Sequence, residues 1–314
     1  MSTGEKKPGF AELASQASLE TMEKPAAIGK KSSKLYIGIP RENSFQENRV
    51  PLTPGAVAAL VSDGHRVVIE SKAGQESHYK DKDYIEAGAR VVADHKEVFQ
   101  ADIIIKVAPP SVKEIKLLHD KQILLSPIHL PTLKRAYIEE LQKRKITAIA
   151  FEYIKDDAGT FPFVRSMSEM AGSSAILIAS ELLSDKNTGK GILLGGISGV
   201  PPTKVLILGA GVVGEYAART ALGLGATVQL FDNNIYKLLR LQNHIGTRLY
   251  TSILDPNTLT EELKNADVVV GAVHSESGRS PVIVTEQMVS EMKPGSVIID
   301  VSIDQGGCCL LYTS

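Results

Sequence analysis

The stretch Lys204–Asp232, KVLILGAGVVGEYAARTALGLGATVQLFD, constrains the fold more than any other part of the chain. An apolar strand leads directly into Gly209-x-Gly211-x-x-Gly214, which opens a helix, and a second strand follows. In such a unit the first glycine makes a tight turn, the second lets backbone approach a pyrophosphate, and the third lets helix and strand pack closely. This order predicts a parallel α/β sheet that binds a dinucleotide.

The second strand of this unit ends in an acid, Asp232, at about the twenty-residue spacing typical of dinucleotide-binding folds. A carboxylate there accepts hydrogen bonds from ribose hydroxyls and repels a 2′-phosphate. The amide donors at the start of the helix suit the phosphates. We therefore expect the coenzyme to be NAD rather than NADP. No metal site is expected from the sequence. A glycine turn without a ligand is the weaker alternative, because every part of the unit is present.

Short β-rich runs alternate with helical stretches along most of the chain, which favours parallel sheets covered by helices. The first series has strand candidates Leu35–Ile39, Arg66–Glu70, Ile103–Val107, Gln122–Leu125 and Ala148–Ala150, and helix candidates Pro54–Asp63, Lys82–Ala87, Val112–Leu118 and Thr132–Lys143. The second has strand candidates Val205–Leu208, Thr227–Phe231, Val268–Val273 and Val297–Ile303. The predicted class is α/β with two domains, a Rossmann-type doubly wound parallel sheet and a flavodoxin- or Rossmann-like substrate domain.

With 314 residues, 43% of them apolar, the chain has room for two domains with cores of their own. We expect a flexible tail over residues 1–34, a substrate-binding domain over 35–165, an NAD-binding domain over 166–308 and an atypical tail over 309–314. A bridging helix is predicted over Ser166–Leu183, where Ser166-x-x-Glu169 resembles a capping box, although an ordinary packed helix fits the same pattern. The turn-rich segment Gly189–Pro202 predicts a hairpin or loop.

Charge and cysteine content narrow the class of function. The 35 basic residues nearly balance the 36 acidic ones, so no overall field favours nucleic acid or an anionic membrane. The only cysteines, Cys308 and Cys309, are adjacent and cannot form a disulfide framework or a CxxC metal site, which fits a reducing cytoplasm. The start, Met1–Lys34, lacks the apolar stretch of a secretory signal. These features favour a cytoplasmic protein that binds small molecules.

Three polar residues follow strand candidates of the first series. They are Arg49 in GIPRENSFQENRVPLTP, Lys106 in IIIKVAPP and His129 in ILLSPIHLP. The carboxyl ends of strands are where open α/β sheets bind ligands. A charge at the end of an apolar strand is unfavourable unless it emerges at a sheet edge or cleft, as we expect for Lys106. Taken singly, a solvated arginine, a lysine reaching solvent and a histidine bonded to backbone remain open as alternatives.

Together these segments resemble the family of alanine dehydrogenases and the NAD-binding part of pyridine nucleotide transhydrogenases. The match extends from about Leu35 to Cys308 through GIPRE, ENRVPLTP, IIIKVAPP, FEYIKDDAGTFPFVRSMSEMAG, GAGVVG and MKPGSVIIDVSIDQGG. The segments Ser166–Glu169 and Ile303–Gly307 are similar to the alanine dehydrogenase branch rather than to the transhydrogenases. Departures are small: Pro51 stands where alanine is usual, and Gln46-Glu47-Asn48 precedes Arg49 where a slightly different spacer is common.

The resemblance implies reversible, NAD-dependent oxidative deamination of L-alanine to pyruvate and ammonium. The NAD-binding subunit of a proton-translocating transhydrogenase and a non-catalytic NAD-binding fragment remain alternatives. A hydrolase is disfavoured, since the sequence has no GxSxG or HExxH motif, and Gly189-Lys190 does not complete a P-loop.

The same resemblance assigns residue roles. Arg49 would clamp the substrate carboxylate, and Lys106 would bind the carboxylate or carbonyl oxygen. His129 would move protons as acid and base, while Asp304 would orient the water or amine. NAD contacts map to Ser168, Gly209, Ala210, Gly211, Gly214, Asp232, Lys237, Val273 and Val301.

Members of the family continue past the DQGG segment, whereas the match here ends at Cys308 and the last residues, CLLYTS, resemble nothing expected. The resemblance therefore implies a C-terminally truncated chain, which we expect to be poorly soluble or inactive. It also implies a homohexamer whose partners are small molecules, with neither nucleic acid nor membrane among them.

Overall fold

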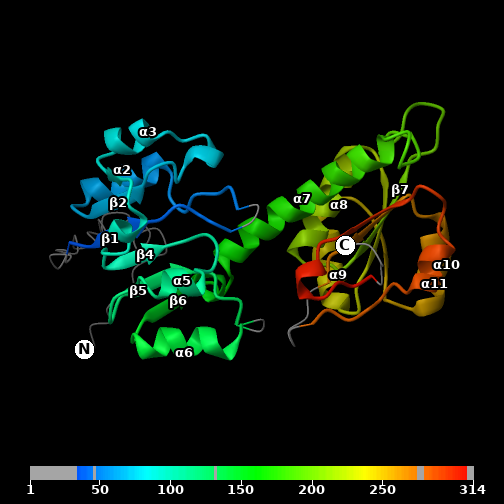
Figure 1. Ribbon diagram of the computed structural model, residues 1–314. Helices are drawn as coiled ribbons and strands as arrows, with labels where there is room; N and C mark the ends of the chain where they lie inside the picture. The colour runs from blue at the N-terminus through cyan, green and yellow to red at the C-terminus, as the bar shows by residue number, and fades with distance from the viewer. Residues whose placement is uncertain (1–33, 45–46, 131–132, 274–278, 310–314) are drawn as a thin grey trace, which may run out of the picture. The chain divides into compact units, whose positions relative to one another are not determined.

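The computed structural model of the protein describes residues 34–44, 47–130, 133–273 and 279–309, so the predicted tails lie outside the described residues apart from Lys34 and Cys309. Two sheets are present, a six-stranded one in the order β3-β2-β1-β4-β5-β6 and a five-stranded one in the order β11-β10-β7-β8-β9 (Figure 1). Strand pairs in both are parallel. The predicted α/β class with parallel sheets is confirmed, while the domain limits stay a prediction.

The N-terminal sheet and the helices around it include most of the elements predicted for the first series. Its strands are β1 Tyr36–Ile39, β2 Arg66–Glu70, β3 Arg90–Val92, β4 Ile103–Ile105, β5 Ile123–Ser126 and β6 Thr147–Ala150. Its helices are α2 Pro54–Ser62, α3 Asp81–Glu86, α4 His95–Val98, α5 Val112–Ile115 and α6 Arg135–Lys143. Helix α2 starts where the sequence predicts, because Thr53 Oγ1 accepts a hydrogen bond from Ala56 N and Pro54 occupies the first turn. The short elements β3 and α4 were not predicted.

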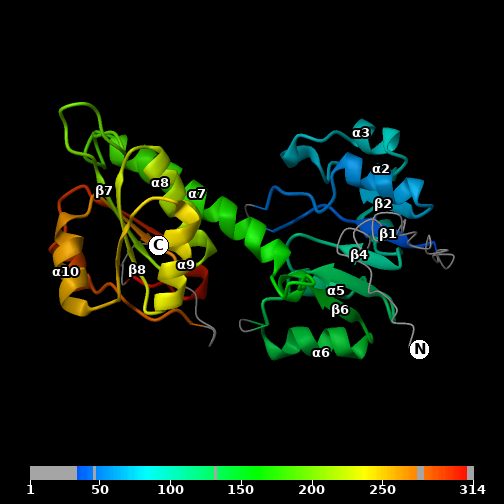
Figure 2. The ribbon, with the colours of Figure 1, turned by 180° about the vertical axis from the view of Figure 1, so that it is seen from behind.

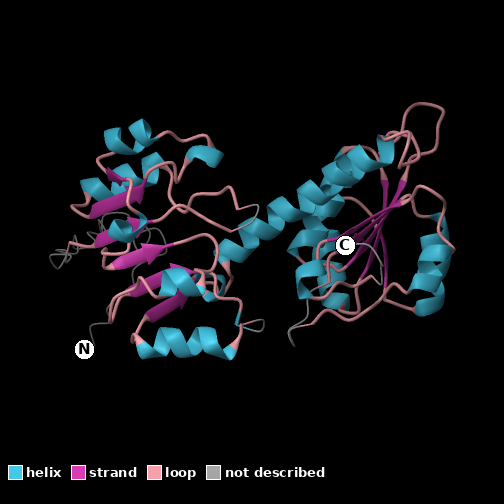
Figure 3. Cartoon of the chain, in the orientation of Figure 1, coloured by secondary structure: helices cyan, strands magenta, loops and turns pink. Residues whose placement is uncertain are grey.

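The C-terminal sheet has the strand order of a doubly wound dinucleotide-binding fold. Its strands are β7 Lys204–Leu208, β8 Thr227–Phe231, β9 Tyr250–Ser252, β10 Val268–Gly271 and β11 Val297–Asp300. Its helices are α7 Pro162–Ser184, α8 Val212–Gly223, α9 Ile235–Ile245, α10 Pro256–Asn265 and α11 Glu286–Ser290. Helices cover both faces of this sheet (Figures 2 and 3).

Strand β7 shows how both faces are buried. Val205 and Ile207 belong to one apolar core, which includes residues of α7, α8 and α9. Leu206 and Leu208 belong to a second core on the other face, together with residues of α10. All four side chains are completely buried, which is why this strand is a continuous apolar run rather than an alternating one.

Helix α7 lies where the bridging helix is predicted, but it begins earlier than expected, and its bridging role stays a prediction. Its first residue is Pro162, so the predicted capping box at Ser166 is wrong. Ser166 Oγ donates instead to Pro162 O at 3.0 Å, and Glu169 forms an ion pair with Arg165 at 2.9 Å. Helix α7 packs along α8 so closely that a Cβ on Gly172 would collide with the carbonyl oxygen of Val213. The two backbones are therefore in direct contact.

The end of β11 also differs from the prediction. The strand stops at Asp300, and Ile303–Gln305 forms a 3-10 helix (η4) instead of continuing the strand. Gly306 and Gly307 follow with φ of 95° and 73°, and they turn the chain back. The Gly189–Pro202 segment contains an isolated antiparallel bridge between Ile197 and Val200, as predicted for a hairpin. Among the described residues, no helix is long and apolar enough to cross a bilayer.

Candidate functional site

The glycine turn after β7 lies at the point where the strand order of the C-terminal sheet reverses. Gly209 has φ of 109°, and a Cβ there would collide with Ala272 O, just beyond β10. A Cβ on Gly214 would collide with Gly209 O, so this glycine is needed for close packing of α8 on the strand. A Cβ on Gly211, in contrast, would meet nothing within 4 Å. The turn is therefore tight on its protein side and open where a pyrophosphate would approach.

Asp232, directly after β8, is tied to this turn. Its Oδ2 accepts a hydrogen bond from Ala210 N at 2.7 Å, and its Oδ1 accepts one from Asn234 N at 2.7 Å. The carboxylate is half-buried and fixed in orientation by two backbone amides. An open glycine at the start of a helix, with an oriented acid beside it, fits the pyrophosphate and the adenosine ribose of NAD.

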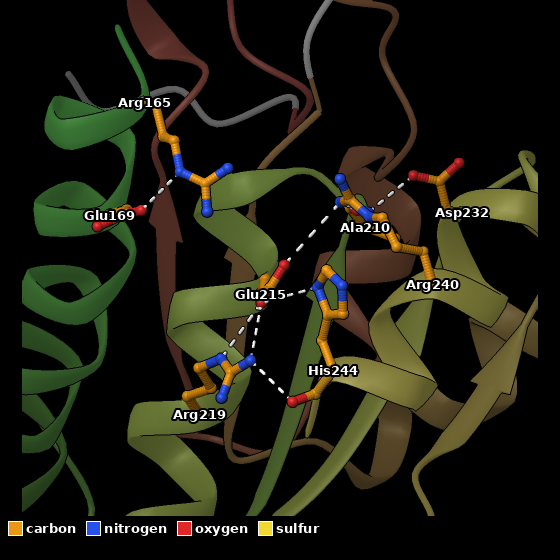
Figure 4. A network of polar contacts seen from close by, with 8 residues as sticks. All are labelled: Arg165, Glu169, Ala210, Glu215, Arg219, Asp232, Arg240 and His244. Carbon is orange, nitrogen blue, oxygen red and sulfur yellow. Dashed lines mark hydrogen bonds and ion pairs between the residues drawn. The ribbon is translucent and has the colours of Figure 1, made fainter. Parts of the chain in front are cut away.

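A buried acid behind the turn was missed by the sequence reasoning. Glu215 lies in the first turn of α8 and is 7% exposed. Its carboxylate lies 2.9 Å from Arg219, 3.5 Å from His244 Nδ1 and 4.0 Å from Arg240 (Figure 4). Arg240 also donates to Ala210 O at 3.3 Å, so α9 is connected to the glycine turn. The i,i+4 spacing of Glu215 and Arg219 was the available signal.

The remaining predicted NAD residues are distributed around this end of the sheet. Ser168 lies one turn before Gly172 on α7, the residue that contacts the start of α8. Val273 follows β10, and Val301 follows β11 and donates its N–H to Gly271 O at 2.9 Å. Lys237 is exposed on the first turn of α9, where its N–H donates to Asn234 Oδ1 at 3.1 Å.

Arg49 lies in a polar pocket of about 310 Å³. The pocket is lined by Arg41, Glu42, Asn43, Ser44, Glu47, Asn48, Arg49, Lys72, Ala73 and Glu76. Arg49 Nε and Nη2 donate to the two carboxylate oxygens of Glu47 at 2.7 and 2.6 Å, a fork-to-fork pair. This hydrogen bonding raises the pKa of Arg49 in spite of partial burial. The guanidinium is therefore oriented to bind a carboxylate, and a carboxylate of the chain itself occupies the fork.

Lys106 does not reach solvent, contrary to the expectation that its charge would emerge at an edge or cleft. The residue is 0% exposed, and its Nζ lies 3.1 Å from Glu114 Oε1. Glu114 is held in turn by Ser111, whose N–H and Oγ donate to Oε2 at 2.7 and 2.8 Å in a capping box of α5. A buried counter-charge thus takes the place of solvent.

The ionisation of Glu114 reflects opposing effects. Burial favours the neutral acid, but the charge of Lys106 and the hydrogen bonds from Ser111 outweigh it and hold the pKa of Glu114 below its usual range. The phenol of Tyr137 lies close to this ion pair. Its burial and the negative charge of Glu114 raise the pKa of Tyr137 to about 12. The lysine therefore has an ionised carboxylate as its partner at neutral pH.

His129 has an exposed side chain on a constrained backbone. Its φ is 50°, in the left-handed region, and Glu152 Oε1 accepts hydrogen bonds from the N–H groups of both Ile128 and His129 at 2.9 Å. Glu152, which sequence reasoning missed, thus fixes the loop that presents the imidazole. The backbone of Asp304 lies in η4, but its side chain lies outside the described residues.

Comparison with known proteins agrees with these features. The model of the N-terminal domain of alanine dehydrogenase/PNT matches residues 38–171, and that of the C-terminal domain matches residues 175–314. The chain is 42% identical over 273 residues to an alanine dehydrogenase of Staphylococcus epidermidis, covering 87% of this chain and 73% of that enzyme.

Solved structures of an alanine dehydrogenase and of a transhydrogenase also superpose on the chain. An L-alanine dehydrogenase superposes with a TM-score of 0.83 at 39% identity, covering 88% of this chain and 77% of that one. A transhydrogenase from Sinorhizobium meliloti superposes with a TM-score of 0.76 at 28% identity, covering 87% of this chain and 80% of that one. The chain belongs to the alanine dehydrogenase/PNT family.

Proposed function

We propose that the protein is an NAD-dependent alanine dehydrogenase that oxidises L-alanine to pyruvate and ammonium and catalyses the reverse reaction. The observation that carries the proposal is the open glycine turn with Asp232 oriented against it, in a chain 42% identical to an alanine dehydrogenase. Bound NAD⁺ supplies the acceptor for the hydride that leaves the α-carbon of the amino acid. Asp232 selects this coenzyme over NADP by repelling a 2′-phosphate.

Other residues around the turn would hold the coenzyme. The turn formed by Gly209, Ala210, Gly211 and Gly214 is proposed to face the pyrophosphate at the start of α8, while the amides of Gly209 and Ala210 donate within the protein to Phe231 O and Asp232 Oδ2. Ser168 is proposed to bind the phosphates, Lys237 the adenosine end, and Val273 and Val301 the walls of the nicotinamide pocket. Their support is the placement of Ser168 near the start of α8 and of the two valines at the carboxyl ends of β10 and β11.

The substrate would be held by two cations. The fork of Arg49 accepts a carboxylate in the geometry that Glu47 already occupies, so the substrate carboxylate replaces the Glu47 carboxylate. Lys106 is proposed to bind the carboxylate or carbonyl oxygen; its ammonium group is buried beside Glu114 in this structure, so the substrate must first gain access to it.

Proton transfer is assigned to His129. After the α-carbon is oxidised, water adds to the iminium group of the substrate, and the resulting carbinolamine loses ammonia as its hydroxyl becomes the ketone. The imidazole accepts the proton from the attacking water and returns one to the departing amine. The Glu152 contacts to the backbone at residues 128 and 129 fix the loop that carries the imidazole. Asp304 is proposed to orient the water and to stabilise the cationic iminium.

We further propose that the chain works in the cytoplasm as a homohexamer. Cys308 and Cys309 are free thiols, as expected in a reducing compartment. Helix α7 carries a set of exposed large apolar side chains: Phe163, Val164, Met167, Met170, Leu177, Ile178 and Leu182. Such a surface on one helix supports association between copies of the chain.

The decisive experiment follows NADH absorbance in the presence of pyruvate and ammonium, with glyoxylate and larger 2-oxo acids in parallel. For a chain extended with the C-terminal segment of a family member, we expect oxidation of NADH with pyruvate, and a loss of at least about 100-fold in kcat for His129→Ala at unchanged NADH affinity. Activity only with another oxo acid would change the substrate but keep the mechanism. NAD binding without turnover of any amino acid would favour the transhydrogenase subunit or the non-catalytic protein instead.

A further inference from the structure

We propose that Asp300, Cys308 and Cys309 form a binding site for a thiophilic divalent cation of the zinc class, Zn²⁺ or Cd²⁺. One ligand atom from each residue lies within 4.8 Å of the others. The two Sγ atoms are 3.8 Å apart, and Cys308 Sγ lies 3.6 Å from Asp300 Oδ1. Neither the reaction proposed above nor its coenzyme requires this cluster, so the inference stands independently of both.

Two of the three separations between the ligand atoms are those of a tetrahedral zinc site, and the third, from Cys309 Sγ to the Asp300 carboxylate, is within 4.8 Å. With Zn–S bonds of about 2.3 Å and a Zn–O bond of about 2.0–2.2 Å, two sulfurs lie about 3.8 Å apart and a sulfur and an oxygen about 3.5 Å apart. The observed 3.8 and 3.6 Å agree with both edges of this tetrahedron. A water molecule or another exogenous ligand would complete the coordination.

The backbone holds the cluster together without a metal. Asp300 Oδ2 accepts hydrogen bonds from the N–H groups of Cys308 at 2.8 Å and Cys309 at 3.1 Å. Cys308 O accepts in turn from Ile283 N at 2.8 Å and Val284 N at 3.1 Å. These bonds join the end of β11 to the returning segment, so a cation would find its ligands already in place.

A glycine makes room for the thiol. A Cβ on Gly271 would collide with Cys308 Sγ and would come within 3.0 Å of Asp300 Oδ1. Both cysteines are buried, at 0% and 7% exposure, in the core that also contains Leu206 and Val284. Two thiolates and one carboxylate oxygen favour a soft d¹⁰ cation over Mg²⁺ or Ca²⁺, which require six or more oxygen ligands.

The position of the cluster suggests what the cation would do. Residues 300 and 308 bracket the segment that contains η4 and therefore Asp304, which is proposed to orient the water. A cation held at both ends of this segment closes it into a short loop and stabilises its conformation. The effect of the metal would be on the rigidity of the segment rather than on the chemical step.

The test is a titration of the reduced, metal-free 314-residue chain with CdCl₂, followed by the sulfur-to-cadmium charge-transfer absorption in the ultraviolet. Because the chain has only 2 cysteines, any such band reports this site. We expect one cadmium per chain and displacement of the cadmium by zinc. Loss of an outer-shell partner alone reduces metal affinity about 10–100-fold, so Cys309→Ser should weaken binding at least about 100-fold and Asp300→Asn at least about tenfold.

Ser302→Ala is the matched control. Ser302 is 5% exposed, lies two residues from Asp300 and contributes only its backbone N–H to the cluster, at 2.9 Å from Asp300 Oδ1. The affinity of this variant for cadmium should equal that of the wild type. A band that Cys309→Ser leaves unchanged in affinity would overturn the proposal, as would the absence of any band.

A second measurement needs only the wild-type chain, in case a variant fails to fold. Zinc at saturation should slow the reaction of the two thiols with an aromatic disulfide reagent at least about tenfold, because both thiolates become ligands. An unchanged rate would identify Cys308 and Cys309 as ordinary core residues that act as small apolar side chains. Protection by zinc together with the one-to-one stoichiometry would establish the site.

Discussion

Replacing Glu114 by glutamine should lower the free energy of unfolding by about 3–5 kcal/mol, the usual cost of removing one member of a buried ion pair. The full range applies here because the Lys106 side chain is 0% exposed and that of Glu114 only 8%, so solvent cannot replace the lost carboxylate. Glutamine keeps the shape of the side chain and its carbonyl can still accept from Ser111, so the charge is the main difference.

Equilibrium urea unfolding, followed by circular dichroism, measures this loss. The matched control is Glu139→Gln, which breaks the Arg135–Glu139 pair whose side chains are 92% and 58% exposed; it should change stability by at most about 1 kcal/mol. The double variant Lys106→Met/Glu114→Leu removes both charges and should recover most of the stability. A loss below about 1 kcal/mol for Glu114→Gln, or a double variant no more stable than the single one, would refute the reasoning.

The pH dependence supplies a second test of the same ion pair. The pKa of Glu114 is lower in the folded protein than its ordinary value of 4.5, so its stabilising contribution is fully present above the unfolded-state pKa. That contribution is lost as the pH falls through the folded-state pKa. The difference in stability between wild type and Glu114→Gln should therefore be constant near neutral pH and shrink below about pH 4.5. A difference that grows on acidification contradicts the assignment.

Three further perturbations test other parts of the structure. Asp232→Ser should raise the Kd for NADH about 10–100-fold, since it removes hydrogen bonds to a charged acceptor, and it should improve the binding of NADPH. Calorimetric titration with both coenzymes measures the two affinities. An unchanged preference for NADH would contradict the role of the acid. Glu47→Gln should lower the KM for pyruvate by about fivefold, because a partly exposed ion pair, with side chains 52% and 12% exposed and worth about 1 kcal/mol, no longer competes for the Arg49 fork. A raised KM would mean that Glu47 supports the site instead. Gly172→Ala should destabilise the protein by about 1–3 kcal/mol in thermal unfolding, because the added Cβ would meet a carbonyl oxygen of α8. Gly223→Ala is the control and should not destabilise the protein, because a Cβ there meets nothing within 4 Å.

Local signals in the sequence predicted the nucleotide-binding half of the fold well. The apolar run of β7, the glycines of the turn and the acid after β8 are neighbours along the chain, and in the structure the Asp232 carboxylate accepts a hydrogen bond from Ala210 N in that turn. The short strands β3 and β9 were missed because three residues leave little periodicity to detect.

The partners of the predicted site residues depend on tertiary packing and were harder to predict. The spacing Ser-x-x-Glu occurs at residues 111–114 and at 166–169, yet only the first forms a capping box. Pro162 starts α7 one turn earlier than the second motif, and Ser166 lies inside the helix. The true capping box holds Glu114 beneath Lys106, a contact between residues that no local pattern pairs.

The backbone at position 129 limits which side chains can occupy it, independently of their chemistry. With φ of 50°, the position suits asparagine, aspartate, glycine or histidine, while valine, isoleucine and threonine would strain the chain. A saturation library at this codon should therefore separate into two groups. Asparagine and glycine variants would fold and lack acid–base activity, and β-branched variants would lose soluble protein as well, so expression and turnover report two different constraints on one residue.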